Sequence, residues 1–331
     1  MCGPVLVTGG SGFVGGAELA RLVERGREVR ALTRSVPSAG ALSRAGAQPV
    51  RGDILDRTSL ESAMAGCDVV YHLAGLNGFC LPDPRELTRM NVEGTRLVVL
   101  AAAAAGVRRI VYTSSAATIG EPAGSVGSEE SRHRGSFLSH YERSKYEGER
   151  VALATATARG TELVSVNPSS VQGPGRTRGT ARILIDALNG RLSTVVDSRM
   201  SLVDVFDCAE GHLLAEERGV PGRRYILSGV TLTVTEALAL LGTISGREEH
   251  PRTLPGPVAM AAAAGAELVA RVRRRRPSVC REMVRTILHG HAYDGSRATR
   301  ELGLAYTPLE ESLRRTVDWY VAEGLVPRAP R

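Results

Sequence analysis

Two residues suited to proton transfer stand in the stretch HYERSKYEGER, residues 140–150. Tyr141 is followed four positions later by Lys145, and side chains at this spacing share one face of a helix. A tyrosine hydroxyl titrates at about pH 10. A nearby ammonium group favours the phenolate and lowers that pKa toward neutrality. The spacing therefore predicts that Tyr141 and Lys145 form a general acid/base pair.

Lys145 is set apart by composition as well as by position. It is the only lysine among the 42 lysine and arginine residues of the chain. A guanidinium is a planar group that keeps its charge, whereas an ammonium is a compact donor on a flexible stem. The single lysine indicates a position at which arginine cannot replace it.

A phosphate-binding motif lies near the start of the chain, where residues 5–15 read VLVTGGSGFVG. A strand-like run leads into three glycines in GxxGxxG spacing, and a helix-like run follows. The first glycine permits a tight turn, the second permits close approach of a pyrophosphate, and the third permits close helix packing. The amides at the helix N-terminus then face the phosphates. The alternative to phosphate binding is a turn with a structural role only. The predicted cofactor contacts are Gly9, Gly12, Phe13, Val14 and Gly15.

The residue that closes the second strand selects the dinucleotide. An acid there binds the ribose hydroxyl of NAD and repels the extra phosphate of NADP. Residues 30–35 read RALTRS, with Thr33 at the acid position and Arg34 beside it. A guanidinium suits a phosphate, so we expect NADP(H). A solvated Arg34 without a ligand is the alternative.

The first half of the chain alternates strand-like and helix-like segments. The strand-like segments are apolar through most of their length, as in a parallel sheet buried on both faces. The pattern predicts a doubly wound α/β Rossmann fold. Strands are expected at Pro4–Thr8, Glu28–Leu32, Ala47–Arg51, Asp68–Leu73, Arg109–Thr113 and Leu163–Val166, and helices at Gly12–Arg25, Arg85–Ala105 and Ser139–Ala158.

The pattern loosens after Asn167. We expect a cofactor domain over residues 1–175 and a smaller, mostly helical substrate domain over residues 176–331. The strand-like pieces beyond it are Ser201–Phe206 and Arg224–Leu227. The first, with the helix to residue 217, is expected to rejoin the main sheet. The segment Ile119–Phe137 is either a loop over the active site or a surface insertion.

Ser114 and Ser115 stand at the carboxyl end of a predicted strand, where such sheets bind ligands. Together with the three glycines, Tyr141 and Lys145, they make the chain resemble the extended short-chain dehydrogenase/reductase superfamily. It is most similar to the branch of dihydroflavonol reductases, 3β-hydroxysteroid dehydrogenases and hopanoid-associated epimerase-like proteins. The resemblance covers nearly the whole chain.

The resemblance implies a role for each catalytic residue. Ser115 hydrogen-bonds the substrate oxygen, Tyr141 transfers the proton, and Lys145 holds the nicotinamide ribose. Asn167-Pro168-Ser169-Ser170 passes beneath the nicotinamide, and a homodimer through two helices is implied. Without the resemblance, Asp53, Asn91 and Ser170 are interpreted as cap or turn residues. The further cofactor contacts are Asp53, Ile54, Leu73, Ala74, Gly75, Asn91, Thr113, Pro168 and Ser170.

These features favour an NADPH-dependent reductase of a ketone or aldehyde. Ser114 and Ser115 replace the acids of sugar dehydratases, and Met200 stands where sugar-nucleotide epimerases place an arginine, with Arg199 one position off. The NPSS stretch also resembles the reductase branch. A redox-neutral sugar epimerase is the second hypothesis, and a non-catalytic dinucleotide sensor is the third.

Composition excludes several classes of protein. The 331 residues are 43% apolar and 23% charged, and no apolar run is long enough to span a bilayer. The first strand begins so early that no export signal is expected, so we predict a cytoplasmic enzyme. The net charge of +7 is modest and does not indicate nucleic acid.

The cysteines and histidines suggest neither disulfides nor metal sites. Cys2, Cys67, Cys80, Cys208 and Cys280 are odd in number and scattered, and are predicted to be free thiols in a reducing compartment. His289 and His291 lack acidic companions in sequence, so zinc is not expected. The segment 258–276, alanine-rich and then arginine-rich, could contact a membrane surface or nucleic acid. A helix packed on the substrate domain with a solvated basic end is preferred.

Overall fold

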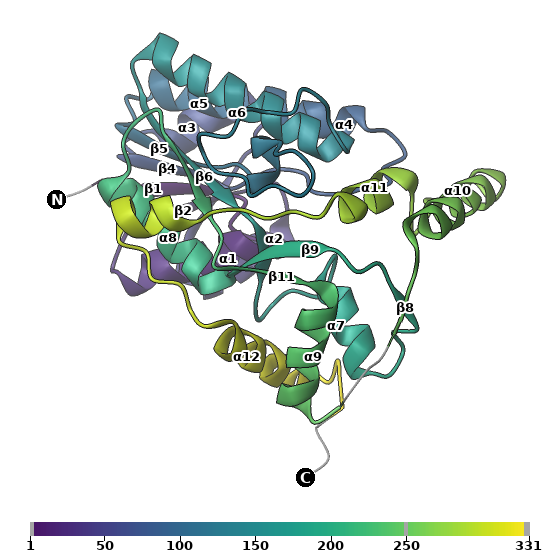
Figure 1. The fold of residues 1–331 in the computed structure, drawn as a ribbon. Coiled ribbons are helices and arrows are strands. Elements are labelled where there is room, and N and C mark those ends of the chain that lie inside the picture. Colours follow the sequence, from purple (N-terminus) through teal and green to yellow (C-terminus); the bar gives the residue numbers. More distant parts are fainter. Residues whose placement is uncertain (1–2, 248–250, 328–331) are drawn as a thin grey trace.

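The computed structural model describes residues 3–247 and 251–327. Its main sheet has seven parallel strands in the order β10-β6-β5-β4-β1-β2-β3 (Figure 1). From β1 the chain adds β2 and β3 on one side. It then adds β4, β5, β6 and β10 on the other side, so the strand order reverses between β1 and β4. This arrangement confirms the predicted doubly wound α/β fold. The strands are β1 (Val5–Thr8), β2 (Val29–Thr33), β3 (Gln48–Arg51), β4 (Val69–His72), β5 (Arg109–Thr113), β6 (Glu162–Pro168) and β10 (Arg224–Leu227).

Helices cover both faces of this sheet. In β1, Val5 and Val7 pack on one face while Leu6 packs on the other, because successive side chains of a strand alternate. This explains why the strands are apolar throughout. One face carries α1 (Phe13–Glu24), α2 (Val36–Arg44) and α8 (Val205–Arg218), and the other carries α3 (Arg57–Met64), α5 (Thr95–Ala104) and α6 (His140–Arg159).

The helix predicted over Arg85–Ala105 is divided into three parts. It comprises α4 (Arg85–Thr88), a π-helical turn over Arg89–Gly94, and α5. A π-turn widens the helix locally and is frequent at functional sites. Here it contains Asn91, which is buried.

The second part of the chain has its own small sheets and core. A three-stranded sheet is ordered β11-β9-β7, and β8 pairs with β12. Leu184, Leu241 and Tyr320 lie in a core shared by three helices. The elements are β7 (Ser170–Gln172), β8 (Thr194–Val195), β9 (Arg199–Asp204), β11 (Val230–Thr233), β12 (Arg252–Thr253), α7 (Ala181–Leu188), α9 (Val234–Ser245) and α12 (Leu309–Ala322).

The prediction that Ser201–Phe206 rejoins the main sheet is wrong for the strand. β9 pairs with β7 and β11 instead, and the edge position beside β6 is taken by β10. β10 suits the position beside β6 because its residues Tyr225, Ile226 and Leu227 are all fully buried. The helix α8 does return, packing on α1 across the main domain.

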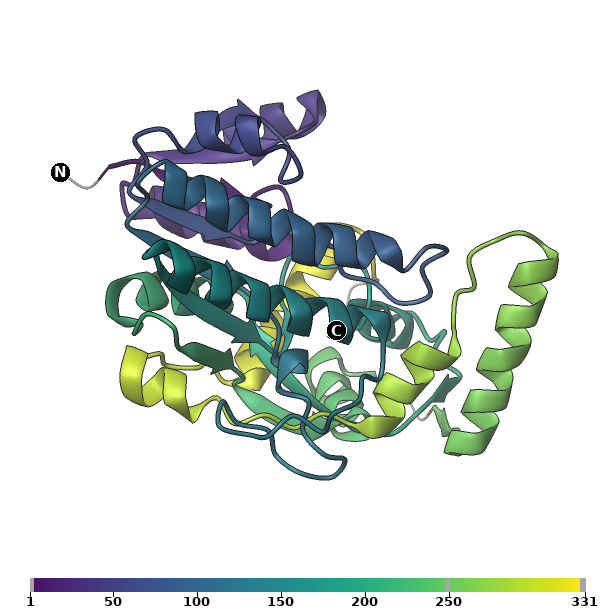
Figure 2. The same cartoon turned by 90° about the horizontal axis from the view of Figure 1, so that it is seen from above.

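A helical hairpin stands at the margin of the molecule. It consists of α10 (Gly256–Val272) and α11 (Arg281–His289), and α10 projects away from the sheet in both views (Figures 1 and 2). Within the described ranges, no helix combines the length and apolarity needed to cross a membrane.

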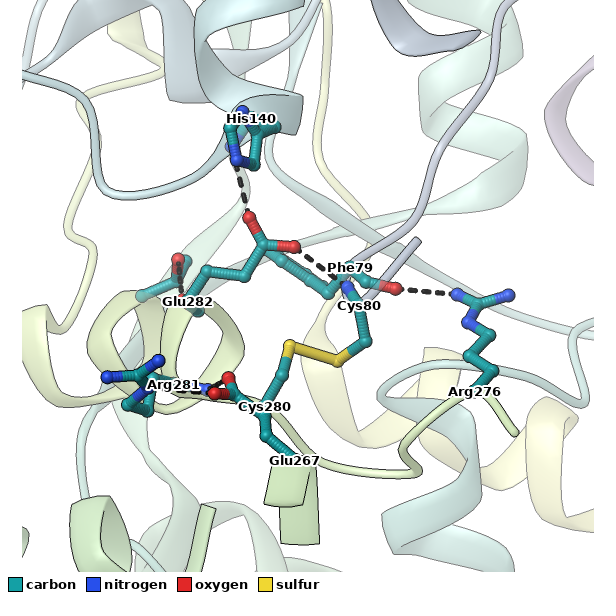
Figure 3. Close-up of a disulfide and its surroundings, with 9 residues drawn as sticks. Phe79, Cys80, His140, Glu267, Arg276, Cys280, Arg281 and Glu282 are labelled. Atoms are coloured by element: carbon teal, nitrogen blue, oxygen red, sulfur yellow. Dashed lines mark hydrogen bonds and ion pairs between the residues drawn. A yellow bond between two sulfur atoms is a disulfide. The ribbon is translucent and has the colours of Figure 1, made fainter. Parts of the chain in front are cut away.

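The cysteine prediction is wrong for two residues. Cys80 and Cys280 form a disulfide, with their Cα atoms 5.7 Å apart, although 200 positions separate them in sequence (Figure 3). Only the tertiary fold brings the two cysteines together, so their spacing in the sequence does not indicate the disulfide. Cys67 and Cys208 are free and buried, as expected, and Cys2 lies outside the described residues. Disulfides are typical of oxidising compartments, so the cytoplasmic assignment stays a prediction.

Candidate active site

The predicted site residues gather along the carboxyl edge of the main sheet. Gly9 follows β1, Arg34 follows β2, and Asp53 lies two residues beyond β3. Ser115 lies two residues beyond β5, and Pro168 ends β6. Parallel strands present their carboxyl ends at one edge, and ligands bind there at the point where strand order reverses.

The glycine motif forms a tight cradle between β1 and α1. Gly9 has a φ of +77°, and a Cβ there would lie 2.7 Å from the backbone nitrogen of Ala74. A Cβ on Gly15 would lie 2.1 Å from the Gly9 carbonyl oxygen. Gly12 is the N-cap of α1, and no side chain among the described residues caps this helix. The first amides of α1 are thus available to a phosphate, with Phe13 and Val14 in its first turn.

Lys145 is buried on α6 against the end of β5. Its Nζ donates to the Thr113 carbonyl oxygen at 2.8 Å and lies 5.0 Å from the centre of the Tyr112 ring. Burial lowers the pKa of Lys145 to about 8, with Glu149 acting in the opposite direction. The compact ammonium fits a space bounded by the backbone and a ring, as the lone lysine suggested.

Tyr141 lies one turn before Lys145 on the same helix. Burial raises the pKa of Tyr141, and the neighbouring Ser115 hydroxyl and the charge of Arg176 act in the opposite direction. The net shift of the Tyr141 pKa is therefore upward, opposite to the lowering toward neutrality that the sequence predicts. The ring of Phe79 meets that of Tyr141 edge-on, with centroids 6.3 Å apart.

A buried polar network that the sequence did not indicate holds the strand ends beside Ser115. Asn167 Nδ2 donates to the Ser115 carbonyl oxygen at 3.2 Å and to Thr118 Oγ1 at 2.9 Å. Its amide also meets Glu149 Oε2, which accepts from Ser165 Oγ at 3.1 Å. The resemblance places this segment beneath the nicotinamide and assigns no role to the Asn167 side chain. Its side chain instead fixes the turn that carries Ser115.

Asn91 fixes a second segment of the site. Its Oδ1 accepts from the Leu76 amide at 2.7 Å, and its Nδ2 donates to the Leu76 carbonyl at 2.9 Å and to Ser144 Oγ at 2.9 Å. A Cβ on Gly75 would lie 3.0 Å from Asn91 Oδ1, and one on Gly148 would lie 2.3 Å from the Asn91 carbonyl oxygen. Asn91 therefore joins the segment after β4, which contains Leu73, Ala74 and Gly75, to α6.

Arg34 and Asp53 face each other at the far end of the edge. Arg34 Nη1 lies 3.5 Å from Asp53 Oδ2, and the Arg34 side chain is 65% exposed. Asp53 Oδ1 also accepts from the Leu55 amide at 3.0 Å. Asp53 thus has the turn geometry given as the alternative. Ile54 is buried beneath it. The exposed Arg34 remains accessible to a ligand.

Arg176 was not singled out from the sequence, yet it faces two parts of the site. Its guanidinium lies 5.8 Å from the centre of the Phe13 ring and donates to the Val171 carbonyl oxygen. Its charge also acts on Tyr141. The only signal was an arginine in the glycine-rich stretch after β7. Ser170, by contrast, makes local contacts, with its Oγ 3.3 Å from Thr180 Oγ1.

The interpretation that His289 and His291 have no acidic neighbour is wrong. Glu121 lies beside both, with His291 Nδ1 2.6 Å and His289 Nε2 3.7 Å from its Oε1. The acid comes from the segment 119–137, which packs on residues 290–294 and bridges to Tyr293. His289 Nε2 also lies 3.2 Å from the Glu121 carbonyl oxygen, so hydrogen bonds account for both rings. The expectation of no metal stays a prediction.

A cavity of about 740 Å³ lies on the other side of α6. Its lining includes Glu129, His133, Glu149, Arg224 and Arg297, and it contains none of the predicted catalytic residues. It is therefore distinct from the edge at which Ser115, Tyr141 and Lys145 lie.

Comparisons with known proteins agree with this fold and identify the family. Residues 5–228 match the model of the NAD dependent epimerase/dehydratase family. The chain belongs to this family, within the extended branch of the short-chain dehydrogenase/reductases. It is therefore an oxidoreductase or epimerase of that group.

Three individual proteins illustrate the range of relatives. A 4-hydroxy-2-methyl-3-oxo-4-farnesyl-3,4-dihydroquinoline-1-oxide ketoreductase of Stigmatella aurantiaca is 34% identical, over 90% of this chain and 91% of the relative. The crystal structure of gox2253 has a TM-score of 0.85 at 31% identity, covering 98% of this chain and 99% of the other. MoeE5 in complex with UDP-glucose and NAD has a TM-score of 0.76 at 25% identity, covering 97% and 99%.

Proposed function

We propose that this protein is an NADPH-dependent reductase of a ketone or aldehyde, with Ser115, Tyr141 and Lys145 as its catalytic residues. The observation that carries the proposal is their convergence at the end of β5. Ser115 lies close enough to Tyr141 to lower its pKa, and Lys145 is bound to the Thr113 carbonyl two residues before Ser115. The Stigmatella relative, named as a ketoreductase, supports this choice among the reactions of the family.

The residues present fit a bound dinucleotide. Gly9 and Gly15 leave room that a Cβ would fill, and the first amides of α1 are free for a phosphate. When bound, NADPH would supply a hydride to the carbonyl carbon. We assign its remaining contacts to Phe13, Val14, Asp53, Ile54, Asn91, Thr113, Pro168, Ser170 and the segment Leu73-Ala74-Gly75. Residues 1–175 would form most of the cofactor domain, and residues 176–331 most of the substrate domain.

Three side chains of the protein would carry out proton transfer and stabilise the charges that develop. Tyr141 donates its hydroxyl proton to the carbonyl oxygen, which becomes the alcohol, and Ser115 donates a hydrogen bond to the same oxygen. Lys145 holds a positive charge on the same face of α6, which favours the phenolate left after proton transfer. Burial raises the pKa of Tyr141 in the free protein, so the group is protonated at neutral pH, as an acid catalyst must be.

Arg34 supports NADPH rather than NADH. It directly follows Thr33, which stands at the end of β2 where an acid would select NAD, and its guanidinium is exposed beside Asp53. A ribose phosphate placed there would meet a planar donor that suits it.

Epimerisation of a sugar nucleotide is the second candidate. The complex of MoeE5 with UDP-glucose and NAD supports it, since that protein shares the fold over nearly the whole chain. Met200, in the position of the epimerase arginine, argues against it. An epimerase would turn over without net consumption of NADPH.

A panel of carbonyl compounds tests the proposal, with NADPH oxidation followed by absorbance. We expect turnover of at least one ketone or aldehyde, abolished by Tyr141→Phe and retained by Tyr146→Phe. Tyr146 is a matched control because it lies on the same helix but packs on His133 and Phe137. Isomerisation of a sugar nucleotide without NADPH loss would favour the epimerase, and tight NADPH binding without any turnover would favour a dinucleotide sensor.

A further inference from the structure

The outer face of α10 is apolar along its whole length. Its exposed positions recur every three or four residues, as expected for one stripe of a helix. Val258, Leu268, Val269 and Val272 are 51%, 62%, 50% and 77% exposed. The positions that complete the stripe are Ala261, Ala262 and Gly265, so it contains no polar side chain.

The opposite face of α10 is already used for packing. Ala259 and Ala263 are buried in a small cluster with Val284 of α11. These short side chains allow close packing of the two helices, and the larger valines and leucine point outward. This is the reverse of a helix that serves the core, in which the large apolar residues face inward. The stripe therefore has the composition of a contact surface.

A dense positive charge continues from the end of this stripe. Arg271 and the run Arg273–Arg276 are exposed at the C-terminal end of α10 and just beyond it. The one acid in the helix, Glu267, is committed to Arg281, with Oε2 2.8 Å from its Nε. The single carboxylate of α10 is thus outnumbered by these five arginines.

We infer that α10 docks on an anionic membrane surface, with its apolar stripe in the acyl boundary and its arginines on lipid phosphates. Seventeen residues span about 25 Å, and a helix with an apolar face and a basic end lies in the plane of the bilayer. A nucleic acid would use the arginines but would leave the valines and leucine in water. A second copy of the chain would cover the stripe, but its own arginines would add to the repulsion.

The residues that follow α10 are joined directly to the segment beside Tyr141. Arg276 Nη2 donates to the Phe79 carbonyl oxygen at 2.6 Å, and the disulfide joins the next residue, Cys80, to Cys280 at the start of α11 (Figure 3). Glu282 Oε1 accepts from the Cys80 amide at 2.8 Å, and its Oε2 accepts from the His140 amide at 3.2 Å. Residues 276–282 therefore link the helix that we propose docks on the membrane to the segment that packs on Tyr141.

Co-sedimentation of the full chain with vesicles tests this inference. We expect binding to phosphatidylglycerol vesicles, weaker binding to phosphatidylcholine vesicles, and loss of binding at high salt. Leu268→Glu with Val272→Glu should lower the partition coefficient at least about tenfold, because each places a charge in the apolar boundary. Val220→Glu is the matched control, since Val220 is 45% exposed but lies outside α10.

Charge variants separate the two contributions. Arg273→Gln with Arg275→Gln should weaken binding to phosphatidylglycerol roughly fivefold per arginine and leave binding to phosphatidylcholine unchanged. Circular dichroism checks that each variant is folded. The inference is overturned if the wild-type chain stays in the supernatant or if Leu268→Glu with Val272→Glu binds vesicles as well as wild type. It is also overturned if a lipid-free dimer dissociates in that variant, or if RNA alone is bound through the arginines.

Discussion

The seven-stranded half of the molecule and the α10–α11 hairpin use apolar residues in opposite ways. Val5, Leu6 and Val7 in β1 are completely buried because helices cover both faces of the sheet. Val272 at the end of α10 is 77% exposed. Both segments are apolar in sequence. The difference shows that apolar character predicts burial only where the topology supplies a second layer.

The two regions also differ in how they are held. The sheet is stabilised by continuous parallel pairing from β3 to β10 and by a core on each face. The hairpin is joined to the body by the disulfide, by Arg276, by the two bonds of Glu282 and by the contact of His289 with the Glu121 carbonyl oxygen. Chemistry is thus placed on the rigid region, and the projecting region is free to make outside contacts.

Replacement of Tyr141 by phenylalanine should have the largest effect and should separate catalysis from stability in the rigid half. We expect turnover to fall by about 10²–10⁴, the range typical for loss of a general acid. Because phenylalanine keeps the ring and removes only the hydroxyl, the melting temperature should stay close to that of the wild type. Steady-state kinetics and calorimetry measure the two quantities, and near-normal turnover would remove Tyr141 from the mechanism.

Removal of the disulfide should affect the hairpin and leave the sheet unchanged. A cross-link that closes a long loop contributes about 2–5 kcal/mol, and this one closes a loop of 200 positions. Cys80→Ser with Cys280→Ser should increase hydrogen exchange in residues 76–81 and 256–289. Exchange in β1, β4 and β5 is the internal control. An equal increase in those strands would show that the two regions unfold together.

Replacement of Arg34 by aspartate should reverse the cofactor preference without altering the fold. An acid at the end of β2 repels the ribose phosphate of NADPH and accepts from the ribose hydroxyl of NADH. We expect the ratio of kcat/KM for NADPH over NADH to fall by about 10–100-fold, from the loss of one charge-assisted contact. Arg57→Asp, on the exposed start of α3, provides the control. An unchanged ratio would contradict the assignment of Arg34.

Replacement of Glu18, in the seven-stranded half, should have the smallest effect. It should change how the stability of the protein depends on pH. Glu18 is fully buried on α1, and its oxygens have no hydrogen-bond partner among the described residues. Burial, followed by the charges of Glu216 and Glu210, raises its pKa well above the ordinary value. The folded state therefore favours the protonated acid, and wild-type stability declines as the pH rises above about 4.5.

Glu18→Gln should remove this decline. We expect the variant to be more stable than wild type by at least about 1 kcal/mol at pH 7, with the difference shrinking below the ordinary pKa of a glutamate. Denaturant unfolding at several pH values measures it. A constant difference at all pH values would show that Glu18 does not titrate within the folded state.

Local patterns predicted most of the catalytic half correctly. The strands at β1, β2, β4, β5 and β10 were found within two residues of their bounds, since buried parallel strands are continuous apolar runs between turn residues. The glycine motif and the Tyr141–Lys145 spacing are likewise local. The π-turn around Asn91 was missed because a widened helical turn has the same periodicity over so few residues.

The remaining parts were decided by contacts between distant segments. The side chain of Asn167 hydrogen-bonds the Ser115 carbonyl oxygen, and Glu121 hydrogen-bonds His291. The charge of Arg176 acts on Tyr141. The residues of each pair lie on different elements, and their separation in the sequence does not indicate the contact. The place of β9 outside the main sheet also depended on β10 occupying the edge.

The sequence by itself determined the doubly wound fold, the phosphate cradle and the helical spacing of Tyr141 and Lys145. Each of these follows from the period of a strand or helix and from the freedom of glycine, which act over a few residues. Only the tertiary structure decided that Cys80 pairs with Cys280, that burial raises rather than lowers the pKa of Tyr141, and that the apolar stripe of α10 faces outward. These properties depend on which surfaces meet, and burial and proximity are set by the packing of the whole chain.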